Sequence, residues 1–280
     1  MLNNIYIECV FILLLCAFTT LSSAQERIAP LKKNDNLFHP TPKKLMRQFV
    51  TDRPDATESP YTLDAGHFQF ETDLFKTERF KVAGTKTTTN SFNVANLKLG
   101  ITHSLDVQFI VGTLITSKIN DGNFTNKKSG FGGLTMRVKQ NIWGNDNGKT
   151  AAAILPFINI PTAFSEKISG GIIFPVAVEL PNEWGLGAQV ESDVASDETG
   201  NKYHLVFLAS ATVSHSLFKR VDFFSEGVVT RDSEIKIFEY FLNAGLVYAI
   251  SKNVKIDGGI YYGLKSESSK TYFIGISFRI

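Results

Sequence analysis

The sequence predicts an all-β fold: a closed, antiparallel transmembrane β-barrel of about 12 strands formed by residues 66–280. Three observations lead to this prediction. Apolar and polar residues alternate, the connections have two unequal lengths, and aromatic residues occur near both ends of the predicted strands. Closing the sheet on itself also removes the unpaired edges that an open sheet would leave in lipid.

The alternation is clearest in the last predicted strand, residues 270–280, where K-T-Y-F-I-G-I-S-F-R-I places apolar residues at every second position. The same pattern recurs in residues 172–180, 186–194, 203–213 and 254–262. No position on the apolar side of these five segments is charged, although 20% of the whole chain is. Each segment is therefore expected to have one apolar and one polar face.

The predicted connections alternate in length along the chain. The longer ones fall at residues 78–89, 114–130, 161–170, 196–201, 231–236 and 266–269. The shorter ones fall near His103 and at residues 144–149, 181–183, 215–219 and 251–253. Outer-membrane barrels have this asymmetry, with long loops outside and short turns in the periplasm.

Aromatic residues are expected at two membrane interfaces. Trp143, Trp184 and Tyr248 lie near the short turns, and Tyr203, Tyr240 and Tyr272 lie near the longer connections. Two such girdles are typical of membrane barrels. A soluble β-sandwich or jelly roll shares the alternation and stays open as an alternative.

The N-terminal residues predict export. Residues 1–24 have an apolar run and end in small residues before Gln25, as a cleaved signal peptide does. Residues 25–65 predict a periplasmic segment punctuated by proline. Both cysteines, Cys9 and Cys16, lie in the signal peptide, so the mature chain has no thiol. The net charge of +2, without a basic stripe, argues against nucleic acid as a partner.

A charged box precedes the first strand and consists of Asp52, Arg53, Pro54, Asp55 and Glu58. One interpretation folds this box into the lumen as a plug, with Arg53 paired to a carboxylate such as that of Glu71 or Asp73. The other is an extended lead-in that covers the barrel floor on the periplasmic side.

The polar side of the strands carries ionisable residues that a barrel would turn toward its lumen. They are Glu71, Asp73, Lys98, Asp106, Arg137, Lys139, Glu191, Asp193, Asp222, Glu226, Glu239, Lys255, Asp257 and Arg279. They could set the selectivity of a pore, or they could form structural ion pairs in a blocked lumen. The same side carries apolar residues suited to a hydrophobic solute, namely Phe75, Phe224, Phe241, Val247, Tyr261 and Phe273.

Catalytic residues, a metal and a cofactor are not expected. His204 and Ser210 share one strand face, but six residues in a strand separate them by roughly 20 Å. The other histidines have no metal-ligand spacing.

Three segments carry a resemblance to a known family. They are residues 51–71, T-D-R-P-D-A-T-E-S-P-Y-T-L-D-A-G-H-F-Q-F-E; residues 97–108, L-K-L-G-I-T-H-S-L-D-V-Q; and residues 130–161. From about Thr51 to its end the chain resembles outer-membrane proteins grouped as transporters of the MetA pathway of phenol degradation. The resemblance implies an outer-membrane β-barrel transporter.

The sequence therefore predicts a bacterial outer-membrane channel or facilitator for small solutes, aromatic or apolar ones among them. The expected partners are outer-membrane lipid, the solute and the barrel-assembly machinery, and the oligomeric state stays open. The alternatives are a structural or adhesive barrel with a blocked lumen that acts through its loops, and a lipid-modifying barrel enzyme.

Overall fold

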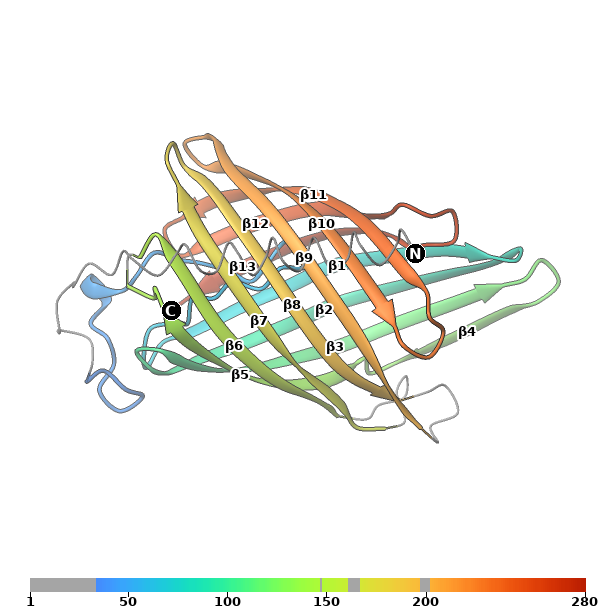
Figure 1. Cartoon of the computed structure of the whole chain (residues 1–280), viewed down its shortest axis with the longest axis horizontal. Helices are drawn as coiled ribbons and strands as arrows, with labels where there is room; N and C mark the ends of the chain where they lie inside the picture. The colour runs from blue at the N-terminus through green and yellow to red at the C-terminus, as the bar shows by residue number, and fades with distance from the viewer. Residues whose placement is uncertain (1–33, 147, 161–166, 197–201) are drawn as a thin grey trace, which may run out of the picture.

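The computed structural model describes residues 34–146, 148–160, 167–196 and 202–280, so the predicted signal peptide lies outside the described residues. The chain forms one antiparallel sheet of 13 strands (Figure 1). Their bounds are β1 Phe68–Val82, β2 Thr85–Thr102, β3 Leu105–Asn120, β4 Thr125–Gly130, β5 Gly133–Trp143, β6 Thr150–Ile160, β7 Ser169–Leu180, β8 Trp184–Ser196, β9 Tyr203–Phe218, β10 Val221–Asp232, β11 Phe238–Ser251, β12 Val254–Gly263 and β13 Lys270–Arg279.

The sheet closes because β13 pairs with β1, from Gln69 opposite Arg279 to Arg79 opposite Lys270. The outer part of β3 pairs with the short β4, and its inner part pairs with β5. β4 and β5 thus occupy one position in the wall, and the ring has 12 strands. This confirms the predicted closed antiparallel barrel.

The alternation places apolar side chains outside and polar ones inside. On β11, Tyr240, Leu242, Leu246 and Tyr248 are exposed, whereas Asn243 between them is only 2% exposed. The largest fully buried side chains are mostly polar and include Lys139, Gln108, Glu71 and Glu226. A soluble sandwich would bury the opposite set, so this arrangement is that of a membrane barrel.

Two of the longer connections expected from the sequence are wrong. β1 and β2 continue through residues 78–89 to a tight turn at Ala83 and Gly84, both with positive φ. Residues 114–130 likewise form the end of β3, a short turn and β4. Threonine, lysine and asparagine predominate in these segments, so the alternation is weaker there and did not reveal them. The outer parts of β1 to β4 form one ribbon that extends the wall (Figure 1).

A β-bulge separates this ribbon from the barrel below it. Leu74 is the extra residue of β1, because Asp73 pairs with Gly275 and Phe75 pairs with Ile274. The bulge reverses the facing of the residues that follow. Phe75 therefore pairs with Phe92 and Ile274, which are exposed on the outside, and does not line the lumen. The expected lumenal position of Phe75 is wrong.

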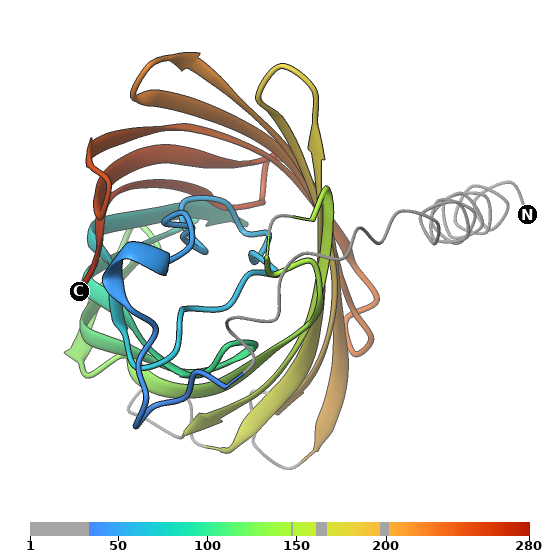
Figure 2. The ribbon, with the colours of Figure 1, turned by 90° about the vertical axis from the view of Figure 1, so that its left-hand side faces the viewer.

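The chain enters the barrel before β1 at the short-turn end. Leu37 donates a backbone hydrogen bond to Ile101, and Thr41 donates one to Ala65. A single 3₁₀ turn, η2, spans Lys43–Leu45. Seen along the barrel, the residues that follow lie inside the ring of strands (Figure 2). Among the described residues, no helix is long and apolar enough to cross a membrane.

Candidate functional site

A segment without regular secondary structure crosses the inside of the barrel, and we call it the strap, residues 51–65. Pro54 and Pro60 restrict its backbone and that of the residues before them, which favours an extended path over a helix. An extended segment leaves its backbone amides free, and these must find partners on the wall. Inward-facing side chains of the strands supply them.

The strap begins at a buried charge cluster around Asp52. Its two carboxylate oxygens lie 2.5 Å from the ammonium groups of Lys98 on β2 and Lys139 on β5. Lys98 also pairs with Glu71 of β1, whose carboxylate accepts the backbone N–H of Asp52 at 3.0 Å. Burial alone would raise the pKa of Asp52, but the two ammonium groups outweigh it and hold the pKa well below its usual range.

Arg53 forms the second anchor. Its guanidinium lies 2.5 Å from Asp73 of β1 and 2.6 Å from Asp257 of β12, and it stacks 5.5 Å from the ring centre of Phe273. Burial would lower the pKa of Arg53, but the two carboxylates outweigh it and raise the pKa above its ordinary value. The pairing of Arg53 with Asp73 is confirmed.

Glu226 of β10 receives the middle of the strap. It accepts the backbone N–H groups of Ala56 at 3.0 Å and Thr57 at 2.7 Å, and the Thr57 hydroxyl at 2.5 Å. Asn243 donates to the same carboxylate at 2.7 Å. Asp55 is a further residue of the strap near Glu226. Burial and the negative charge of Glu226 raise the pKa of Asp55 to about 8, so Asp55 is protonated at neutral pH.

The strap then turns back across the lumen toward β5 and β8. Glu58 pairs with Arg137, and its backbone N–H donates to Gln189 at 2.7 Å. The backbone N–H of Ser59 donates to Asp52 at 3.1 Å, which closes this part of the strap into a loop. Anchors on widely separated strands therefore fix the segment across the barrel.

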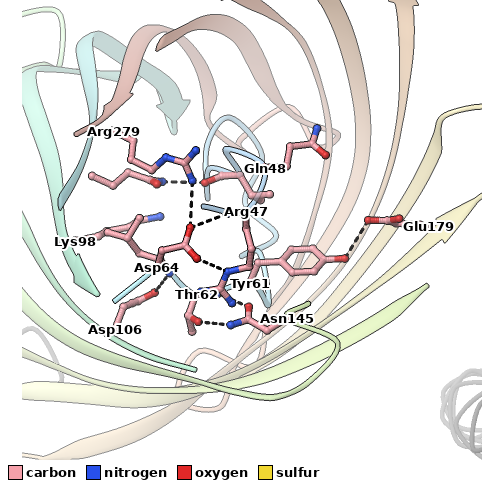
Figure 3. Close-up of a pocket in the computed structure, with 13 residues that line it drawn as sticks. Arg47, Gln48, Tyr61, Thr62, Asp64, Lys98, Asp106, Asn145, Glu179 and Arg279 are labelled. Carbon is pink, nitrogen blue, oxygen red and sulfur yellow. Dashed lines mark hydrogen bonds and ion pairs between the residues drawn. The ribbon is translucent and has the colours of Figure 1, made fainter. Parts of the chain in front are cut away.

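A small polar cavity of about 80 Å³ lies where the strap leaves the barrel (Figure 3). Asp64 lies at its edge, 2.8 Å from Arg47 and 3.6 Å from Arg279. The backbone N–H of Leu63 donates to Asp106 at 2.9 Å, and that of Thr62 donates to Asn145 at 3.0 Å. These contacts join the strap to the barrel floor.

A larger space of about 210 Å³ separates the strap from β7, β8 and β9. Its wall is formed by small residues, among them Ala177, Gly185, Gly187 and Ser214. A Cβ at Gly185 would meet only the hydroxyl of Ser214 within 4 Å, so the wall is open at this point. Open space beside the strap therefore lies along β7 and β8.

Aromatic and aliphatic side chains line the opposite part of the wall. Tyr261 donates its hydroxyl to the carbonyl of Pro54 at 2.5 Å, and its ring lies 4.8 Å from that of Phe273. Phe224 is 4% exposed. Val228, 7% exposed, pairs directly with Phe241 and shares its inward face. The lumen thus combines the charged contacts of the strap with apolar side chains on the inner face of β10 to β13.

The structure brings most of the predicted lumenal residues to the N-terminal segment. Those in contact with it are Glu71, Asp73, Lys98, Asp106, Arg137, Lys139, Glu226, Asp257 and Arg279, and also Lys255, which lies 5.3 Å from the ring centre of Phe49. Three more have other hydrogen-bond partners: Glu191 with Gln189, Asp222 with Ser216, and Glu239 with Ser268. Asp193 lies opposite Gly171 on the same inner side.

Several residues of this network were not predicted from the sequence. Neutral polar side chains such as Gln69, Gln108 and Gln189 are buried on the inner wall, but the prediction named only charged and apolar residues there. Their place on the polar side of alternating strands was the signal that could have found them. Phe49, 3% exposed, had no such signal because it precedes the box.

All six predicted interface aromatics are exposed on the outside. Trp143, Trp184 and Tyr248 lie beside short turns, and Tyr203, Tyr240 and Tyr272 lie at the other end of their strands. Trp184 also stacks on His215 at 4.3 Å between ring centres.

His204 and Ser210 do not form a base and nucleophile pair. His204 lies 3.2 Å from both Asp232 and Glu234, whereas the Ser210 hydroxyl lies 2.7 Å from that of Thr57 in the strap. The two side chains thus serve separate contacts.

A solved outer-membrane channel has a similar fold. The channel of the COG4313 group from Pseudomonas putida F1 is similar with a TM-score of 0.63 and 10% identity, over 82% of this chain and 100% of that one. The translocator domain of the autotransporter NalP from Neisseria meningitidis has a TM-score of 0.48 and 11% identity, over 76% of this chain and 88% of that one. No curated protein sequence matches the chain.

The family described as "Putative MetA-pathway of phenol degradation" matches residues 51–280, which begin at the strap and include the whole barrel. The chain belongs to this family.

Proposed function

We propose that this chain is an outer-membrane channel for small solutes, with a preference for aromatic or apolar ones, and that the strap narrows its lumen. The observation that carries the proposal is the anchoring of Asp52, Arg53 and Glu58 to strands on different sides of the barrel. A segment held in this way leaves no wide aqueous pore, so large hydrophilic solutes are excluded. A narrow path remains along the small residues of β7 and β8.

The preference for aromatic or apolar solutes is supported by apolar side chains on the inner face of β10 to β13. Phe241, Val228 and Phe273 face the lumen next to the strap, where a general porin would have a wetter wall. The charged residues at the strap are largely paired with one another, so they offer less attraction to a permeating ion than unpaired rings of charge would.

In this proposal residues 1–24 are the signal peptide, and the strap occupies the periplasmic half of the barrel. The short turns and both ends of the barrel sequence lie at that end. The barrel-assembly machinery inserts the chain, and the apolar outer surface contacts lipid.

The proposal is tested in planar lipid bilayers with the purified mature protein. We expect small single-channel currents that are interrupted when benzyl alcohol is added and are unaffected by ribose at the same concentration. Folding is checked by the heat-dependent shift in gel mobility that intact barrels show. Interruption by both solutes alike would contradict the aromatic preference.

A second function is a structural or adhesive barrel with a blocked lumen, and the dense ion pairing of the strap favours it. A folded protein that stays silent in the bilayer would support this second function. It would do so most clearly if the variant Asp52→Ala/Arg53→Ala, whose strap has lost two anchors, became conductive in the same bilayer.

A further inference from the structure

The ribbon formed by the outer parts of β1 to β4 carries basic residues in register. Arg79 pairs with Lys270 of β13 on one side and with Thr88 of β2 on the other. Thr88 pairs with Lys118, and Lys118 pairs with Lys127. Directly paired residues of an antiparallel sheet point to the same face, so these basic side chains form one row.

A second row lies next to the first and nearer the tip. Lys81 pairs with Lys86 there, two residues beyond Arg79 and Thr88 on the same strands. Neighbouring strands are about 4.8 Å apart, and residues two apart on a strand about 7 Å. Six basic side chains are therefore gathered on one small area, which we call the basic rim: Arg79, Lys81, Lys86, Lys118, Lys127 and Lys270.

The basic rim faces outward and begins where the apolar outer surface ends. Arg79 lies four residues beyond Phe75 on β1, and Lys118 lies four residues beyond Leu114 on β3, so each pair shares a face. Phe75, Phe92 and Leu114 are 37%, 41% and 45% exposed on the outside of the barrel. Figure 1 shows the ribbon continuing the wall at the end opposite the short turns.

No carboxylate lies among these residues to neutralise them. The other outward residues of the ribbon are neutral, and they include Thr77, Thr88, Asn90, Thr116 and Ser129. Glu78 belongs to the opposite face, because it pairs with Thr271 and Thr89. Within the described part of the chain, none of the six basic residues forms an ion pair. Like charges at these spacings repel, so the face attracts anions from outside the protein.

We propose that the basic rim binds the phosphate groups of the phosphorylated glycolipid in the outer leaflet of the membrane. Those phosphates lie at the border between acyl chains and water, the level at which the apolar surface gives way to the basic rim. Lysine and arginine bind phosphate by charge-assisted hydrogen bonds, and arginine can do so with two bonds at once. The threonine and asparagine side chains between them can bond to the sugar hydroxyls.

The test compares one variant with a charge-matched control. The variant Lys86→Gln/Lys118→Gln/Lys127→Gln removes three charges from the basic rim, and its residues are exposed and lie outside the strap contacts. The control Lys219→Gln/Arg220→Gln/Lys252→Gln removes three exposed charges from the short turns at the other end. Each protein, full barrel and strap included, is titrated in zwitterionic detergent with purified lipopolysaccharide or with the same lipid after removal of its phosphates. Binding is read by native mass spectrometry.

We expect the unaltered protein to bind the phosphorylated lipid on the order of 100-fold more tightly than the phosphate-free lipid, and the rim variant to lose most of this difference. That factor, about 2.7 kcal/mol, corresponds to about 1 kcal/mol for each of the three basic residues that the variant removes. The control should keep the full difference, and added salt should reduce it. Equal binding of both lipids by the unaltered protein would overturn the proposal. An equal loss in the control variant would overturn it as well.

Discussion

The ammonium group of Lys139 lies 2.5 Å from a carboxylate oxygen of Asp52, and the lysine side chain is 0% exposed. Lys139 belongs to β5, whereas Asp52 belongs to the strap, so this pair joins a segment without secondary structure to the barrel wall. A buried ammonium without a counter-charge is costly. The wall lysines and the strap carboxylate therefore depend on each other, and the docked strap is part of the folded barrel.

Replacing Asp52 with Asn should loosen the strap. The change leaves Lys98 paired with Glu71 alone and removes the carboxylate with which Lys139 pairs, and breaking a buried pair costs about 3–5 kcal/mol. Part of this cost is avoided if the strap leaves the lumen and lets water reach the lysines. We expect a larger single-channel conductance and faster proteolysis within residues 51–65. The control Asp121→Asn, in an exposed turn, should change neither quantity.

Docking of the strap should weaken as the pH rises, because of Asp55. The pKa of Asp55 is raised from 3.8 to about 8 by burial and by Glu226, so the docked strap holds a proton that the undocked strap releases. Between about pH 4 and pH 8 the docked state binds more protons, so its stability falls by at most about 1.4 kcal/mol for each pH unit. Above about pH 8 this dependence ends.

The pH dependence is measured as conductance from pH 5 to pH 9. We expect it to increase with pH in the unaltered protein. The variant Asp55→Asn keeps a neutral polar side chain and should show a flatter profile. A profile that is equally steep in both proteins would assign the effect to another group, because Glu58, Tyr261 and Glu226 also surround this site.

The sequence predicted the barrel because lipid and water impose a two-residue period on every strand between them. The same reason explains where prediction failed. Beyond the membrane both faces of a strand meet water, so the largely polar outer parts of β1 to β4 have only a weak period and were expected to be loops. The bulge at Leu74 changes the facing of Phe75 without any change of composition, and no local residue pattern announced it.

The strap could be predicted only in part. Arg53 among acidic residues suggested an ion pair with a carboxylate such as Glu71 or Asp73, since a buried guanidinium needs a carboxylate, and Asp73 is the one of the two that forms it. The partners of Ala56, Thr57 and Leu63 could not be predicted, because they bind the wall through backbone N–H groups, which every residue type has. Their carboxylate partners on β3 and β10 become neighbours only when the barrel closes.

Filling the space between the strap and β8 should reduce solute passage. Gly185 lines the cavity of about 210 Å³, and a Cβ there would meet only the Ser214 hydroxyl. We expect Gly185→Trp to lower conductance several-fold, because the indole would occupy the remaining path while the strap anchors stay intact. Leu186→Trp is the matched control, since Leu186 is 41% exposed on the outer surface. If conductance fell equally in both variants, the cause would be a folding defect and not a blocked path.

A new positive charge should affect stability differently at two adjacent residues of β11. It should destabilise the barrel at Leu246 and leave its stability nearly unchanged at Val247. Leu246 is 53% exposed on the outer surface, so Leu246→Arg would place a guanidinium against lipid, at a cost of up to about 2–4 kcal/mol depending on depth. Val247 faces inward and pairs with Asp222 on one side and Asp257 on the other. An arginine at 247 would therefore lie between two carboxylates and should leave stability nearly unchanged. Unfolding in urea with the protein in lipid vesicles measures both, and equal destabilisation would mean that this strand does not separate lipid from a polar lumen.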